Sequence, residues 1–119
     1  MAISAAKVQA DVQEIVFNNS VKRGVDLAKT KIVSILGCSR VPISQLRVGR
    51  TDVALKPGGQ PFKGYTVHSV FAAPSPRVVA EVESILATWL KACHGAKCEN
   101  GQGEDPVRLG NATLYLAVK

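Results

Sequence analysis

The fold is decided by residues 65–90, which read YTVHSVFAAPSPRVVAEVESILATWL. The first eight residues alternate as in a β-strand, and both alternating sets are fairly apolar, so the strand should be partly covered on both faces. Ser75 and Pro76 then start a helix, because serine caps free N–H groups and proline suits the first helical position. The apolar side chains expected to face the core from this helix are Val79, Val82, Ile85, Leu86, Trp89 and Leu90.

Two further strands are predicted on either side of this segment. Residues 46–53 have a short β-like pattern, and the Pro-Gly-Gly-Gln-Pro stretch at 57–61 marks a loop after it. Residues 93–110 are polar and rich in glycine, which indicates a second loop. The last residues of the chain alternate between core-facing and outward-facing side chains, as in a β-strand. The helix that starts at Ser75 is expected to pack on Leu114, Leu116 and Val118 of this strand.

The N-terminal third of the sequence has helical periodicity. Residues 3–17 carry apolar side chains at i, i+3 and i+4 spacing. Asn18-Asn19-Ser20 favours a break, with Ser20 as the N-cap of a second helix that stops at Gly37. The prediction is therefore a helical hairpin over residues 1–37.

Together these patterns predict one α+β domain over residues 1–119. It has two N-terminal helices and a small, three-stranded, mostly antiparallel sheet with the third helix packed on it; residues 46–119 form the α+β core. Hydrophobic residues make up 46% of the chain and charged residues 20%, which excludes a largely disordered protein.

Charge and cysteine content indicate the class of partner and the cellular compartment that suit this protein. Fifteen Lys and Arg residues against nine Asp and Glu give a net charge of +6, which favours an anionic partner, nucleic acid first. No signal peptide or membrane span is evident, and three cysteines suit a reducing compartment. We therefore expect an intracellular, cytoplasmic protein with no membrane association.

One pair of cysteines has the look of a metal motif. Cys93 and Cys98 flank His94, but a structural zinc site needs four ligands in paired spacings, and Cys38 and His68 do not provide the second pair. Unmetallated cysteines at a helix end are the favoured interpretation.

The order of motifs in the second half resembles the GIY-YIG nuclease family over about residues 46–119. Arg47-Val48-Gly49 stands at the position of the family's second tripeptide and leads into a Gly-Xaa-Thr stretch that ends at Thr51. A helix follows with Ala80, Glu83 and Leu86 at three-residue spacing, and Cys98-Glu99-Asn100 with a glycine-rich tail precedes the final, tyrosine-bearing strand.

The resemblance implies a metal-dependent nuclease that cleaves phosphodiesters. It makes Glu83 the ligand of a divalent metal such as Mg²⁺, which is commonly held by one or two carboxylates and substrate phosphate. Arg50, His68 and Asn100 are then the candidate catalytic residues.

The chain also departs from that family, and a second hypothesis follows. Arg47 stands where the family has tyrosine, and residues 54–68 contain Lys56 and Lys63 but no arginine. The alternative is a non-catalytic basic module that binds nucleic acid or a protein partner. Its candidate binding residues are Arg40, Arg47, Arg50, Lys56 and Lys63. A homodimer through the N-terminal helices is also open, if either helix exposes an apolar stripe.

Overall fold

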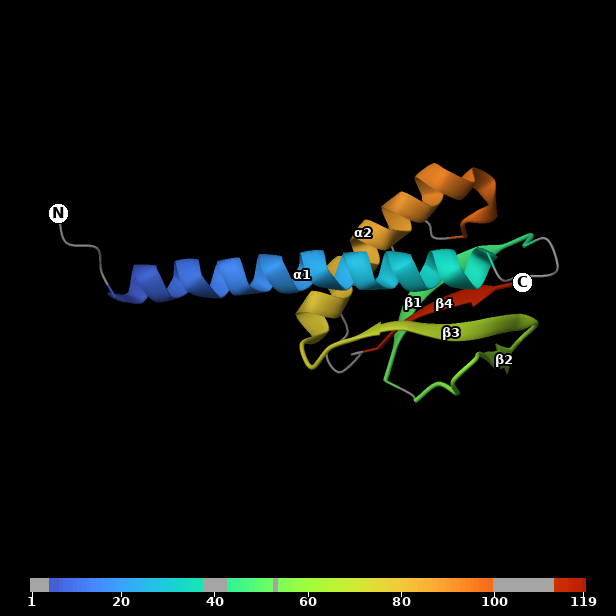
Figure 1. Cartoon of the computed structure of the whole chain (residues 1–119), viewed down its shortest axis with the longest axis horizontal. Coiled ribbons are helices and arrows are strands. Elements are labelled where there is room, and N and C mark those ends of the chain that lie inside the picture. The colour runs from blue at the N-terminus through green and yellow to red at the C-terminus, as the bar shows by residue number, and fades with distance from the viewer. Residues whose placement is uncertain (1–4, 38–42, 53, 100–112) are drawn as a thin grey trace.

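The computed structural model describes residues 5–37, 43–52, 54–99 and 113–119, and it shows an α+β fold. Two helices, α1 (Ala5–Gly37) and α2 (Pro76–His94), accompany one four-stranded sheet (Figure 1). The strands are β1 (Leu46–Thr51), β2 (Gln60–Phe62), β3 (Tyr65–Ala72) and β4 (Thr113–Val118). The predicted fold class is confirmed, and two details of the prediction are wrong.

The N-terminal region is one continuous helix of 33 residues, so the predicted helical hairpin is wrong. Asn18, Asn19 and Ser20 are poor helix formers, but each falls short of alanine by no more than about 0.7 kcal/mol. No proline is present to remove a hydrogen bond, so burial of the apolar residues that follow holds the helix together. The buried residues of α1 recur at helical spacing: Val21, Val25, Ala28 and Ile32.

Gly24 marks the place where α1 packs most tightly. A Cβ atom at this position would lie 2.8 Å from Phe71 Cζ in β3 and 2.9 Å from Val82 Cγ2 in α2. Three elements therefore meet at the bare backbone of Gly24, which explains why a residue that weakens a helix stands inside α1.

The sheet has the order β1-β4-β3-β2, and all neighbouring strands are antiparallel. The prediction of three strands missed β2, which pairs with β3 across a two-residue turn. In that turn Lys63 and Gly64 both have positive φ, 49° and 86°, as a type I′ hairpin requires. Pro61 is tolerated because β2 is an edge strand. The hairpin was hard to predict because lysine replaces the usual Asn or Asp before glycine.

The start of α2 is confirmed. The backbone N–H of Val78 donates to Ser75 Oγ at 3.4 Å, and Pro76 occupies the first turn. The helix runs to His94, and a short 3-10 helix, Gly95–Lys97, follows it, so the first part of the predicted loop is helical. The remaining loop from residue 100 onward lies outside the described residues.

The buried face of α2 differs in part from the prediction. Val82 and Leu86 are fully buried as expected, but Ile85 is 37% exposed and Trp89 is only partly buried. Val79 and Leu90 are fully buried, as the helical pattern predicted.

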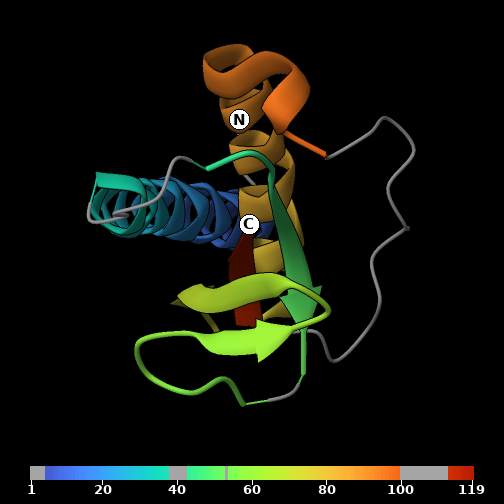
Figure 2. The same ribbon diagram turned by 90° about the vertical axis from the view of Figure 1, so that its right-hand side faces the viewer.

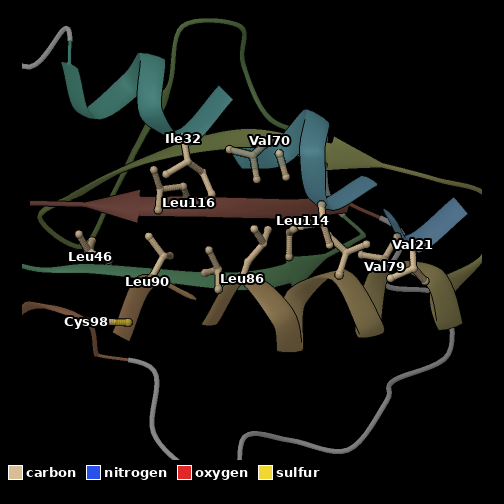
Figure 3. Close-up of a cluster of buried hydrophobic side chains, with 14 of the residues drawn as sticks. Val21, Ile32, Leu46, Val70, Val79, Leu86, Leu90, Cys98, Leu114 and Leu116 are labelled. Atoms are coloured by element: carbon tan, nitrogen blue, oxygen red, sulfur yellow. The ribbon is translucent and has the colours of Figure 1, made fainter. Parts of the chain in front are cut away.

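The core fills the space between the helices and one face of the sheet (Figure 3). Its largest fully buried side chains are Ile32, Leu46, Leu86, Leu90, Leu114 and Leu116. Burial of each such side chain contributes roughly 1.5–3 kcal/mol. Since β4 supplies two of them from the middle of the sheet, the last strand of the chain is central to the fold.

Both helices lie on the same side of the sheet (Figure 2). The helix α2 packs on β1 and β4, and α1 packs on β3. Within the described residues, neither helix carries an apolar segment that would span a lipid bilayer. The molecule measures 62 × 28 × 26 Å, and its long dimension comes from α1, whose N-terminal half extends past the sheet (Figure 1).

Candidate nucleic-acid interface

The face of the sheet that points away from both helices carries the candidate site. Leu46 and Val48 of β1 point into the core, so alternation turns their neighbours Arg47 and Gly49 the other way. The same rule and the strand register assign the other members of this outer face. Its residues are Arg47, Gly49, Gln60, Phe62, Tyr65, Val67, Tyr115 and Ala117.

The register arranges the outer face in rows across the strands. One row joins all four strands, with Arg47 opposite Ala117, Ala117 opposite Val67, and Val67 opposite Gln60. A second row places Phe62 beside Tyr65. The outer face therefore combines one arginine with small, apolar and aromatic side chains that share one surface.

The outer face is hollowed into a depression of about 560 Å³. Arg47, Phe62, Tyr65 and Tyr115 all line it, so residues far apart in the sequence meet there. Lys63 lines it too, with Nζ 5.3 Å from the centre of the Phe62 ring.

A second lysine reaches this surface from the C-terminus. Lys119 Nζ lies 4.8 Å from the centre of the Tyr65 ring. A cation over a ring face is attracted to its π electrons. Each of the two aromatic rings at the hairpin end therefore has a positive charge beside it.

Tyr65 is oriented by a hydrogen bond. Its hydroxyl donates to Glu99 Oε1 at 2.5 Å. That hydrogen bond is the main reason why the pKa of Tyr65 is raised, and the positive charge of Arg47 opposes the shift. The ring is thus held beside Arg47 with its phenol protonated.

Tyr115 lies across the backbone of Gly49 on the neighbouring strand. A Cβ atom at Gly49 would overlap the Tyr115 ring, with Cε2 only 2.7 Å away. Gly49 therefore leaves room for the Tyr115 ring to lie against the backbone of β1, and this contact fixes the position of the ring in the depression.

Arg47 has donor capacity left for a ligand. Its Nε is buried and has no hydrogen-bond partner among the described residues. Buried donors in folded proteins nearly always find an acceptor.

Of the residues predicted for nuclease chemistry, the structure brings Glu83 and Arg50 together, whereas His68 lines a different cavity. Glu83 accepts a hydrogen bond from Arg50 Nε at 2.9 Å, and the two side chains are only 13% and 7% exposed. The pair joins α2 to β1, and Arg50 also lines the depression of the outer face. Asn100 lies outside the described residues.

The surroundings of Glu83 do not fit Mg²⁺. The Arg50 guanidinium binds Glu83 Oε2, so an arginine takes the place of a metal in neutralising the negative charge of Glu83. In the part of the chain that the structure describes, no three His, Cys, Asp or Glu side chains form a metal-ligating group. We therefore propose no metal-dependent step. The role of Glu83 as a metal ligand stays a prediction from the sequence.

His68 faces the helix side of β3, in a different cavity of about 680 Å³. Lys31 and Lys56 also line this cavity. Burial, and then the positive charge of Lys31, lower the pKa of His68 below its ordinary value. His68 is thus neutral near pH 7 and stands apart from both Arg50 and the outer face.

The predicted basic set is divided in the same way. Arg47, Arg50 and Lys63 line the depression of the outer face, and Arg50 also pairs with Glu83. Lys56 lines the cavity beside His68 instead. Arg40 lies outside the described residues. Sequence reasoning missed the aromatic residues Phe62, Tyr65 and Tyr115 and the terminal Lys119. The signal that could have found Tyr115 is its alternation with Leu114 and Leu116, which turns it away from the core.

Comparison with known proteins adds no identification. No protein-family model, curated protein or solved structure matches this chain.

Proposed function

We propose that this protein is a non-catalytic module that binds single-stranded nucleic acid through the outer face of its sheet. The observation that carries the proposal is the interleaving of cations and aromatic rings there: Arg47 beside Tyr65, Lys119 over Tyr65, and Lys63 over Phe62. Single strands expose both phosphates and unpaired bases, and these are the two groups that such a surface attracts.

The position of each side chain on the outer face gives it a separate role in binding. Tyr65 and Phe62 provide rings on which bases stack. Lys119 and Lys63, which lie over these rings in the free protein, turn to the phosphates when a strand binds. Arg47 lines the same depression and adds a positive charge for the phosphates. The net charge of +6 adds long-range attraction for a polyanion.

Binding of a fluorescein-labelled, unstructured oligonucleotide, followed by anisotropy, tests the proposal. A 15-nucleotide deoxythymidine strand and the matching uridine strand separate DNA from RNA, and a duplex of equal length is the competitor. We expect the single strands to bind more tightly than the duplex. Tyr65→Ala should weaken binding about 5- to 150-fold, because stacking of one base contributes ~1–3 kcal/mol.

The matched control for the lysines is on the other side of the molecule. Lys63→Gln and Lys91→Gln remove the same charge from exposed positions, but Lys91 is on α2. Only Lys63→Gln should weaken binding and reduce the slope of log K against log salt by about 0.7. Equal effects of both substitutions would show attraction by net charge alone and would refute the outer face as the site.

The same samples test the prediction of metal-dependent cleavage. The labelled strand is incubated with 5 mM Mg²⁺ or with EDTA and analysed on a denaturing gel. The proposal expects an intact strand in both. Cleavage that disappears with EDTA and with Glu83→Gln would favour the nuclease hypothesis instead.

A further inference from the structure

The N-terminal part of α1 projects from the domain without a partner in the chain. Phe17 of α1 contacts α2, where the Arg77 guanidinium lies 4.2 Å from the centre of the Phe17 ring. Residues 5–16 precede it and stand free of the sheet and of α2 (Figure 1). At roughly 1.5 Å per residue, they form a rod about 18 Å long.

This rod carries an exposed apolar stripe. Val8, Val12, Ile15 and Val16 are each between 49 and 58% exposed, and they follow one another at helical spacing. Val12 and the buried Val21 are nine residues apart, about two and a half turns, so the stripe faces away from the core. The packing of α1 on its own domain therefore leaves the stripe uncovered.

A free helical rod of this length is not stable by itself. Isolated helices shorter than ~12–15 residues are marginal in water, and most helices in proteins depend on packing of an apolar face. A surface that covers the stripe would stabilise the first three turns of α1. The stripe has no lysine or arginine within it, so an apolar partner suits it.

We propose that the stripe is covered by the same stripe of a second copy, with the two α1 helices antiparallel. Centred on Ile15 and Val16, the pairing sets Ile15 against Val16 of the second copy. Asp11 and Lys22 are eleven residues apart, about three turns, and so lie on the same flank of the helix. The two-fold axis brings equal flanks together, which places Asp11 beside Lys22 of the second copy at both ends.

Charge also decides the orientation. Arg23 is exposed and lies eleven residues after Val12, in line with the stripe. In a parallel pair Arg23 would face Arg23 of the second copy, and like charges in a seam repel. In the antiparallel pair Arg23 lies near Val8 of the second copy, where its stem packs and its head reaches water.

Sedimentation velocity over a range of protein concentrations tests this pairing. The matched variants are Ile15→Glu and Val33→Glu, since both positions are 58% exposed and lie on the same side of α1, eighteen residues apart. Val33 is beyond the reach of the second copy in the proposed register. We expect wild type and Val33→Glu to sediment as dimers, and Ile15→Glu to have a dimer dissociation constant at least about tenfold higher.

A charge exchange tests the register. Asp11→Lys should weaken the dimer, and the double substitution Asp11→Lys with Lys22→Asp should restore it. Circular dichroism confirms that each variant is folded. A monomeric wild type at about 100 µM, an unchanged dimer in Ile15→Glu, or equal effects of the two glutamates would each refute the pairing. Oligonucleotide binding by a monomer would leave the proposed function intact, so the two proposals can fail separately.

Discussion

Single residues set the character of the outer face. Gly49 has no side chain, so the Tyr115 ring of the neighbouring strand lies over its backbone. Glu99 accepts the Tyr65 hydroxyl, and this holds a second ring beside Arg47. The sequence predicted Arg47 and Lys63 as binding residues because positive charge is visible in a sequence. It did not predict the rings between them, because their alignment depends on the register of β1, β3 and β4.

The ion pair of Glu83 with Arg50 is predicted to be structural. Glu83→Gln leaves the Arg50 guanidinium without its carboxylate in a site that is only 7% exposed, so unfolding should require about 3 kcal/mol less free energy. The control is Glu81→Gln, an exposed position on the same helix, with a change within about 0.5 kcal/mol. Urea denaturation measures both, and equal stability of the two variants would contradict the structural role.

The environment of His68 predicts a pH dependence of stability. Its pKa in the folded protein is lowered below 6.5 by burial and by Lys31, so the unfolded state binds the proton more readily. The His68 contribution is therefore fully present above about pH 6.5 and is lost as the pH falls through the lower, folded pKa.

Thermal or urea unfolding between about pH 7.5 and pH 5 checks this dependence. His68→Gln should give a flatter profile than wild type, and Lys31→Gln should flatten it in part because burial remains. Parallel profiles of stability against pH for wild type and His68→Gln would show that protonation of His68 does not contribute to the pH dependence.

At the scale of elements, capping and periodicity were sufficient for α2 and β3. Ser75, Pro76 and an alternating strand are local signals, and both elements begin where the sequence places them. The predicted break at Asn18 was wrong because weak propensity is overridden by burial further along the same helix. The edge strand β2 was missed because three residues carry no periodicity, and only pairing with β3 defines them.

The crossing of α1 over β3 and α2 predicts an unusual response to alanine. In a helix Gly→Ala normally stabilises by ~1 kcal/mol. At Gly24 the new methyl group would meet Phe71 Cζ at 2.8 Å and the buried Val82 Cγ2 at 2.9 Å, so Gly24→Ala should instead destabilise by about 1–3 kcal/mol. Gly37→Ala, with nothing within 4 Å, is the control and should be neutral or stabilising. A gain in melting temperature for Gly24→Ala would contradict the packing.

At the scale of the whole molecule, the two faces of the sheet differ in character. One face and both helices enclose the core (Figures 2 and 3), whereas cations and aromatic rings line the outer face. The N-terminal half of α1 extends past the sheet, and we propose that it mediates self-association. Composition indicated an anionic partner, but only the tertiary structure separates a binding face from a packing face.

The most direct test of the central claim is a titration of ¹⁵N-labelled protein with an unstructured oligonucleotide, followed by amide chemical shifts. We predict that the perturbed amides cluster on the outer face around Arg47, Tyr65 and Tyr115, and that those of Lys91 and its neighbours on α2 do not move. Perturbations confined to the helices, or no perturbation at millimolar oligonucleotide and low salt, would contradict the assignment of the outer face as a nucleic-acid interface.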